Sequence, residues 1–117
     1  MVPTRISPGE VKRRLDFGEP IFFIDTRTAD AWENSNIKIP GAHRIPYSEM
    51  EKHLYEIPRN RMIVTYCTLP EEASSTRAAQ ILQNKGFKQV YPLQGGFNAW
   101  VEAGYPLAPK SADAPES

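Results

Sequence analysis

The sequence predicts an α/β fold built on a mainly parallel sheet, and two observations support this prediction. Short apolar segments typical of buried strands recur along the chain, most clearly at residues 20–25 and 62–66. Segments with the capping residues and apolar spacing of helices lie between them. Strands that alternate with helices pair in parallel, because each helix returns the chain across the sheet.

The helical start signals are strongest near the N-terminus. Ser7 suits the N-cap, Pro8 the first helical position, and Glu10 completes a capping box, while Gly18 suits the end of the helix. The sequence therefore predicts a helix that is capped by Ser7, begins at Pro8 and leads into the strand at 20–25.

The remaining elements are predicted in the same way. Ser48 and Glu51 repeat the capping-box signature and predict a helix there. Gly86 suits a C′ position, and Gly95-Gly96 suits a tight turn into a last helix. The other predicted segments are a short helix at 28–33, short strands at 42–45 and 89–93, a helix ending near 86, and a helix at 97–103.

Length and composition limit the class of protein. The chain has 117 residues, of which 40% are hydrophobic, and this suffices for one domain with its own core. The 14 Lys and Arg residues balance the 14 Asp and Glu residues, which argues against a nucleic-acid binder with a basic patch. No run of like charge suggests a membrane anchor. We expect the domain to span residues 1–107 and the small, polar segment 108–117 to be a disordered tail.

The compartment follows from targeting signals and cysteine content. No N-terminal apolar stretch has the length of a signal peptide, and the apolar run 21–24 is too short to cross a bilayer. We therefore expect a cytoplasmic protein. Cys67 is the single cysteine, so an internal disulfide and a multi-thiolate metal site are both excluded.

Cys67 occupies the position in the predicted fold where ligands commonly bind. It follows the strand 62–66 directly, at the carboxyl end of the sheet, and precedes a helix. The N–H groups and dipole at a helix N-terminus favour a thiolate there. The segment 68–76 is rich in small and hydroxyl residues that suit a bound sulfur species or a small oxyanion.

Two alternatives to this interpretation stay open from the residues alone. Cys67 suits a small buried hydrophobe at the end of a core strand equally well. Glu71 and Glu72 suit a first helical turn, where carboxylates stabilise the helix. If they faced the thiolate instead, they would repel an anionic substrate.

Several short motifs, in this order and spacing, resemble the single-domain rhodanese-like sulfurtransferases. They are Ile24-Asp-Thr-Arg27, Ile39-Pro-Gly-Ala42 with Ile45-Pro46, Val64-Thr-Tyr-Cys67, Arg77-Ala-Ala, Val90-Tyr-Pro-Leu-Gln-Gly-Gly96 and Ala99-Trp100. The resemblance runs from about residue 6 to residue 106. It implies a three-layer fold with a central, mainly parallel sheet of about five short strands flanked by helices.

The resemblance also implies a reaction. Cys67 would take a sulfane sulfur from a donor such as thiosulfate, hold it as a persulfide and pass it to cyanide or a thiol, with a protein persulfide donor as a further partner. No metal or organic cofactor, nucleic acid or membrane is implied. Asp25 would be structural near the site. The residues expected to bind substrate are Thr68, Leu69, Pro70, Glu71, Glu72, Ala73 and Arg27.

The chain departs from the family pattern after Cys67. Family members commonly have a short loop with a Gly and then an Arg or Thr, whereas nine residues without a glycine separate Cys67 from Arg77 here. Related cysteine phosphatases need an Arg six places after the cysteine to clamp phosphate, and Ala73 stands there. The unusual loop keeps open an alternative function, a non-catalytic rhodanese-like module for binding or redox sensing. Likewise, Arg27 suits either an anion-binding role or a structural ion pair with Asp25.

Overall fold

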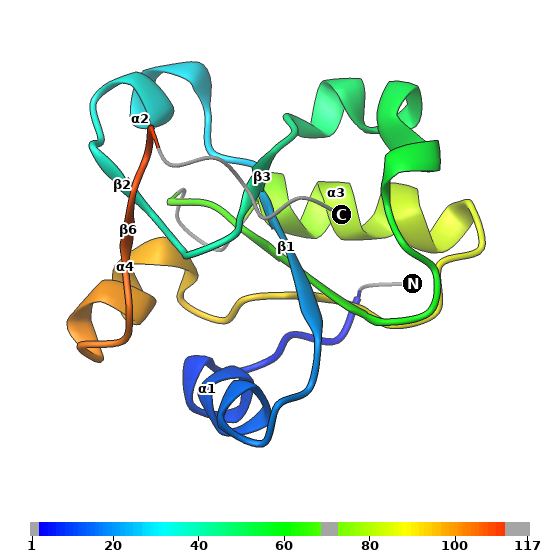
Figure 1. The fold of residues 1–117 in the computed structure, drawn as a ribbon. Coiled ribbons are helices and arrows are strands. Elements are labelled where there is room, and N and C mark those ends of the chain that lie inside the picture. The colour runs from blue at the N-terminus through cyan, green and yellow to red at the C-terminus, as the bar shows by residue number, and fades with distance from the viewer. Residues whose placement is uncertain (1–2, 69–72, 112–117) are drawn as a thin grey trace.

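A four-stranded parallel sheet forms the centre of the protein (Figure 1). The structure is a computed structural model that describes residues 3–68 and 73–111. The strand order is β3-β1-β4-β5, with every neighbouring pair parallel. The strands are β1 (Ile21–Asp25), β3 (His43–Arg44), β4 (Met62–Tyr66) and β5 (Val90–Pro92). The predicted parallel sheet is confirmed with four strands rather than about five, and Ile6 adds only an isolated parallel bridge to Leu93.

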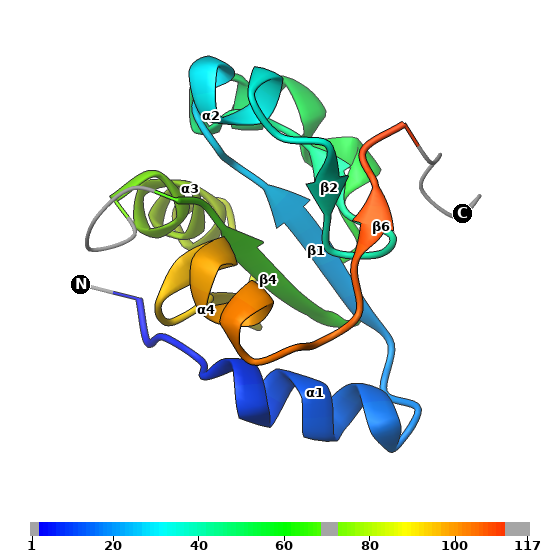
Figure 2. The same ribbon diagram turned by 90° about the vertical axis from the view of Figure 1, so that its left-hand side faces the viewer.

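Helices cover both faces of this sheet and give the predicted three layers (Figure 2). On one face α1 (Pro8–Asp16) and α4 (Gly96–Glu102) pack on a core that includes Phe23 and Tyr66. On the other face α3 (Ala73–Asn84) and the 3-10 helix η1 (Tyr47–Glu56) pack on a core that includes Ile24 and Ile63. Because β4 lies between both cores, all five of its residues are buried, as its apolar sequence predicts.

The predicted helix starts are confirmed at two places and wrong at a third. Ser7 Oγ accepts a hydrogen bond from the backbone N of Glu10 at 3.1 Å, so the cap of α1 forms. Thr28 caps α2 (Ala29–Glu33) in the same way, through the N–H of Ala31 at 3.2 Å. Ser48, in contrast, lies inside η1, which begins directly after Pro46 without a side-chain cap. Here the chain turns straight out of β3, and the N–H of Glu49 closes a tight turn on the carbonyl of Pro46.

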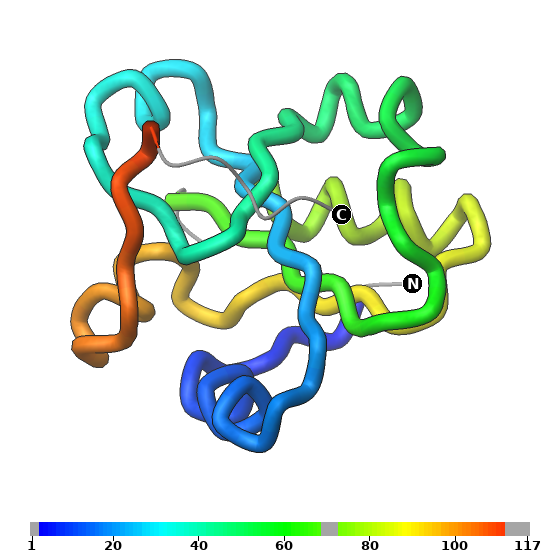
Figure 3. The backbone as a smooth tube through the Cα atoms, viewed as in Figure 1, coloured from blue at the N-terminus to red at the C-terminus, as the bar shows by residue number. Residues whose placement is uncertain are grey.

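A small second sheet joins distant parts of the chain. Strand β2 (Ile37–Lys38) pairs antiparallel with β6 (Ala108–Pro109), and the two run side by side in all views (Figure 3). Lys110 continues this contact, because its N–H donates to the Asn36 carbonyl at 2.8 Å. The segment expected to be a disordered tail therefore includes the short strand β6 at 108–109 and the hydrogen-bonded Lys110. Residues 112–117 lie outside the described residues. None of the helices in the part of the chain that is described has the length and hydropathy needed to cross a bilayer.

The turn before α4 brings that helix against the end of β4. Gly95 and Gly96 both have positive φ, 78° and 66°. A Cβ atom on Gly96 would collide with the carbonyl oxygen of Cys67. The same oxygen accepts a hydrogen bond from the N–H of Phe97 at 2.8 Å. Gly96 is thus required by its conformation and by its close approach to the residue after β4.

We expect Gly96→Ala to lower the free energy of unfolding by about 2 to 4 kcal/mol, because the strain of a positive φ adds to the collision with a backbone atom. Gly104→Ala is the matched control, since Gly104 has φ of 76° and no atom near its Cβ position. Its loss should be about 1 kcal/mol. Urea unfolding followed by circular dichroism measures both, and equal losses would contradict the role of the close approach.

Candidate functional site around Cys67

Cys67 lies where the sequence predicts, directly after β4 at the carboxyl end of the parallel sheet. Its thiol donates to the Oγ of Ser75, with 3.7 Å between sulfur and oxygen. Ser75 belongs to the first turn of α3. The sulfur therefore sits beside a helix start that has hydroxyl and N–H groups to offer an anion.

Two hydrogen bonds and complete burial fix the position of this cysteine. Thr65 Oγ1 donates to the Ser75 carbonyl at 2.9 Å, which ties α3 to β4 two residues before Cys67. The Cys67 carbonyl is held by the N–H of Phe97 at the start of α4. The whole residue is 0% exposed. Cys67 thus has the burial of a core residue and the hydroxyl contact expected of a functional thiol.

The predicted loop residues are only partly described. Thr68 follows Cys67 in a bend and is partly exposed, and Ala73 is the exposed first residue of α3. The predicted substrate-binding residues Leu69, Pro70, Glu71 and Glu72 lie outside the described residues. Ser75 was not singled out by the sequence. The run of hydroxyl residues from 68 to 76 indicated that one of them could contact the sulfur. The geometry of the first turn of α3 determines that this residue is Ser75.

Arg27 and Asp25 form a buried ion pair at the end of β1. Arg27 Nη2 lies 2.7 Å from Asp25 Oδ2, and its Nε lies 3.0 and 2.9 Å from the two carboxylate oxygens. Both side chains are 1% exposed. Arg27 Nη2 also donates to the Ile37 carbonyl at 3.0 Å, and the guanidinium lies 4.5 Å from the centroid of the Phe97 ring. These contacts support the structural role that the sequence left open for Arg27.

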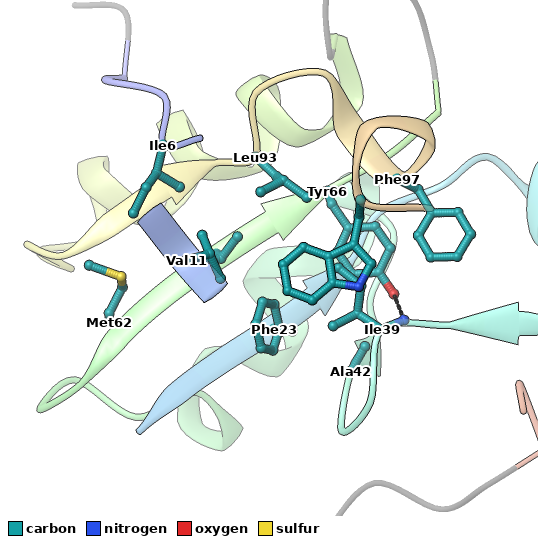
Figure 4. Close-up of a cluster of buried hydrophobic side chains, with 11 residues drawn as sticks. Ile6, Val11, Phe23, Ile39, Ala42, Met62, Tyr66, Leu93 and Phe97 are labelled. Carbon is teal, nitrogen blue, oxygen red and sulfur yellow. Dashed lines mark hydrogen bonds between the residues drawn. The ribbon is translucent and has the colours of Figure 1, made fainter. Parts of the chain in front are cut away.

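Tyr66 extends this pair across the sheet. Asp25 and Tyr66 are register partners on β1 and β4, and the Tyr66 hydroxyl is hydrogen-bonded to the carboxylate. That hydroxyl also accepts from the N–H of Ile39 at 3.2 Å, shown by the dashed line in Figure 4. Burial, and then the negative charge of Asp25, raise the pKa of Tyr66 above its ordinary value. Tyr66 is therefore protonated and serves as a hydrogen-bond donor.

A cavity of about 320 Å³ opens at this edge of the sheet, which we call the donor cavity. It lies between the loop after β1, the start of η1 and the first turn of α3. Ser74, the neighbour of Ser75, is among its lining residues, as are Arg27 and Arg44. A larger cavity of about 540 Å³ lies elsewhere, beside the first half of β1, and none of the predicted site residues that the structure describes lines it. Among residues 3–68 and 73–111, no three His, Cys, Asp or Glu side chains gather as a metal site would require.

We expect Asp25→Asn to lower the free energy of unfolding by about 3 kcal/mol or more, because it leaves the Arg27 charge buried without its partner. The matched control is Asp16→Asn, which removes an ion pair between Lys12 and a 62% exposed carboxylate. That loss should stay within about 0.5 kcal/mol. Equal losses in chemical denaturation would show that the buried pair does not support the fold.

Comparison with known proteins places this fold in a known family. The model of the rhodanese-like domain family matches residues 7–103. A sulfurtransferase from Allochromatium vinosum is 31% identical over 102 residues, covering 87% of this chain and 92% of that protein. An adenylyltransferase and sulfurtransferase from Zea mays is 31% identical over 113 residues, covering 88% of this chain but 23% of that protein.

Solved structures give the same result. The rhodanese-like domain of an Anabaena protein superposes with a TM-score of 0.75 at 26% identity, covering 100% of this chain and 87% of that one. The matched segment contains both helical layers, the parallel sheet and Cys67. This chain belongs to the rhodanese-like domain family.

Proposed function

We propose that the protein transfers a sulfane sulfur through a persulfide on Cys67, taking it from a donor such as thiosulfate and giving it to cyanide or a thiol. The family and its sulfurtransferase relatives support sulfur transfer in general. The observation that carries the specific proposal is the contact between Cys67 Sγ and the Ser75 hydroxyl at the start of α3. A cytoplasmic location would suit this role, because the thiol stays reduced there.

The proposed reaction is a pair of displacements at sulfur. The Cys67 thiolate attacks the outer sulfur of thiosulfate, a new sulfur–sulfur bond forms, and sulfite leaves with the electron pair of the broken bond. Cyanide or a thiolate then attacks the outer sulfur of the persulfide and regenerates the Cys67 thiolate. Thiolates attack divalent sulfur directly, so neither step needs an oxidant or a metal.

Ser75 and α3 would stabilise the charged states. The Ser75 hydroxyl accepts from the thiol now, and after rotation it can donate to a thiolate. The persulfide is also an anion, so the same hydroxyl and helix start would hold it. Asp25 already neutralises Arg27, so the positive charge of Arg27 would contribute little attraction for an anionic sulfur donor.

The donor cavity is the proposed route to Cys67. The thiol is fully buried, while Ser74 reaches this cavity from the same helical turn as Ser75. A thiosulfate donor would enter between the loop after β1 and α3, where residues 68–73 remain the predicted substrate-binding segment. A protein persulfide donor would have to present its sulfur through the same opening.

Mass spectrometry of the intact protein tests the persulfide directly. After incubation with thiosulfate we expect the protein to gain one sulfur atom, which cyanide removes as thiocyanate. Cys67→Ser should gain none. If the wild-type protein gains no sulfur from thiosulfate or from a persulfide donor, the carrier proposal fails and a binding or sensing role replaces it.

Ser75→Ala tests the hydroxyl contact. Loss of a hydrogen bond to a charged sulfur should slow sulfur loading at pH 7 by about tenfold, since such a bond contributes about 1.5 kcal/mol. Thr76→Ala, next to it on α3 and partly exposed, is the matched control and should load at the wild-type rate. Equal loading rates in all three proteins would remove Ser75 from the mechanism.

A further inference from the structure

A second cavity of about 320 Å³ meets the donor cavity at Arg44, and we call it the basic cavity. Arg44 is the one lining residue that the two cavities share. The basic cavity lies between α2, β2, β3, η1 and the end of β6. Neither Cys67 nor any described residue of the predicted substrate-binding set lines it.

The charges around the basic cavity are mostly positive. Lys38, Arg44 and Lys110 line it, and Glu56 is the only carboxylate among the described residues that do so. Glu56 is already engaged, because its Oε2 lies 2.9 Å from His53 Nδ1. In the donor cavity the balance differs, since Arg27 is neutralised by Asp25 and Glu49 faces the same space as Arg44. An anion would therefore favour the basic cavity.

Arg44 has hydrogen-bonding capacity that the protein does not use. Its Nε and Nη1 are buried from solvent and have no hydrogen-bond partner among residues 3–68 and 73–111. Most buried polar atoms in proteins are paired, so two unpaired atoms on one guanidinium leave donors that a bound anion could use. The described carboxylates form no ion pair with Arg44 or Lys110.

The side chains of Arg44 and Lys110 both pack against Trp32. The Arg44 guanidinium lies 5.3 Å from the centroid of the indole ring, and the Lys110 ammonium lies 5.0 Å from it. Lys110 Nζ also donates to the Trp32 carbonyl at 2.7 Å. Lys38 is 5% exposed, and its Nζ donates to the Ala42 carbonyl at 3.3 Å. The cations are thus arranged before any ligand arrives, which lowers the entropic cost of binding.

We propose that the basic cavity binds a tetrahedral oxyanion, either free phosphate or sulfate or the phosphate group of a monoester, with Arg44 as its principal hydrogen-bond donor. Guanidinium groups recognise such anions through charge-assisted hydrogen bonds. Lys110 supplies a second positive charge in the lining of the cavity. Anion binding here does not need the proposed persulfide, because the basic cavity lacks Cys67 and Ser75, although Arg44 also lines the donor cavity.

His43 provides an independent probe of anion binding in the basic cavity. Burial and then the charge of Lys38 lower the pKa of His43, while Glu56 acts in the opposite direction. His43 also lines the basic cavity, with its ring stacked on Phe22 at 4.4 Å between centroids. A bound anion would favour the protonated ring and raise this pKa.

Nuclear magnetic resonance of the full chain tests the proposal. Inorganic phosphate, inorganic sulfate and glucose 6-phosphate are titrated separately at constant ionic strength in chloride. We expect the indole N–H signal of Trp32 to move saturably with at least one probe, while that of Trp100, which is fully buried against Pro106, stays in place. The pKa of His43 should rise at saturation. Binding of free phosphate or sulfate identifies a free anion as ligand, and binding of the monoester alone identifies a larger phosphorylated molecule.

Variants separate this site from general charge effects. Arg44→Gln should weaken anion binding at least tenfold. Lys110→Gln should also weaken it, and this second variant keeps the test available if Arg44→Gln does not fold. Arg61→Gln removes the same charge from an exposed residue outside the cavity and should change the affinity less than twofold. Saturable binding by no probe, or equal affinities in all variants, would overturn the proposal.

Discussion

The buried ion pair between Asp25 and Arg27 organises the carboxyl end of the sheet. A buried charge is costly unless its partner and its remaining hydrogen bonds are all in place. Here the carboxylate accepts from Arg27 and Tyr66, and Arg27 also donates to the Ile37 carbonyl. The pair therefore couples the ends of β1 and β4 with the start of β2, and it sits on the Phe97 ring of α4. Because Cys67 directly follows Tyr66, the same constraint fixes where the thiol leaves the sheet.

The surroundings of Cys67 combine rigidity with limited access. Its carbonyl is held by α4, its sulfur contacts α3, and the close approach of Gly96 leaves no room to shift the backbone. Such a thiol suits a reaction in which one small sulfur species must be positioned accurately, since misplacement of reacting atoms is costly in rate. The burial of Cys67 also separates it from solvent, and the donor cavity beside Ser74 is where a substrate would approach.

Local patterns predicted the elements that depend on burial and capping. Strand β4 has the predicted bounds and β1 begins one residue after the predicted start at Pro20, because segments buried on both faces are apolar throughout. The cap at Ser7 was readable because it needs only residues of its own turn. The pairing of β2 with β6 was not, because two-residue strands have no pattern and their partner is distant in sequence. The unpaired hydrogen-bond donors of Arg44 were not predictable from the sequence either, because they depend on which residues the fold places next to the guanidinium. The placement of Cys67 was predictable, whereas its contact with Ser75 needed the geometry of α3.

Locating the transferred sulfur on the chain tests the central claim most directly. The protein is loaded with thiosulfate carrying an isotopically labelled outer sulfur, alkylated to trap persulfides, and digested with trypsin. Cleavage after Arg61 and Arg77 releases residues 62–77, which contain the single cysteine. The account predicts that this peptide carries one labelled sulfur between Cys67 and the alkyl group. Label on any other peptide, or an unlabelled alkylated Cys67 after loading, would contradict it.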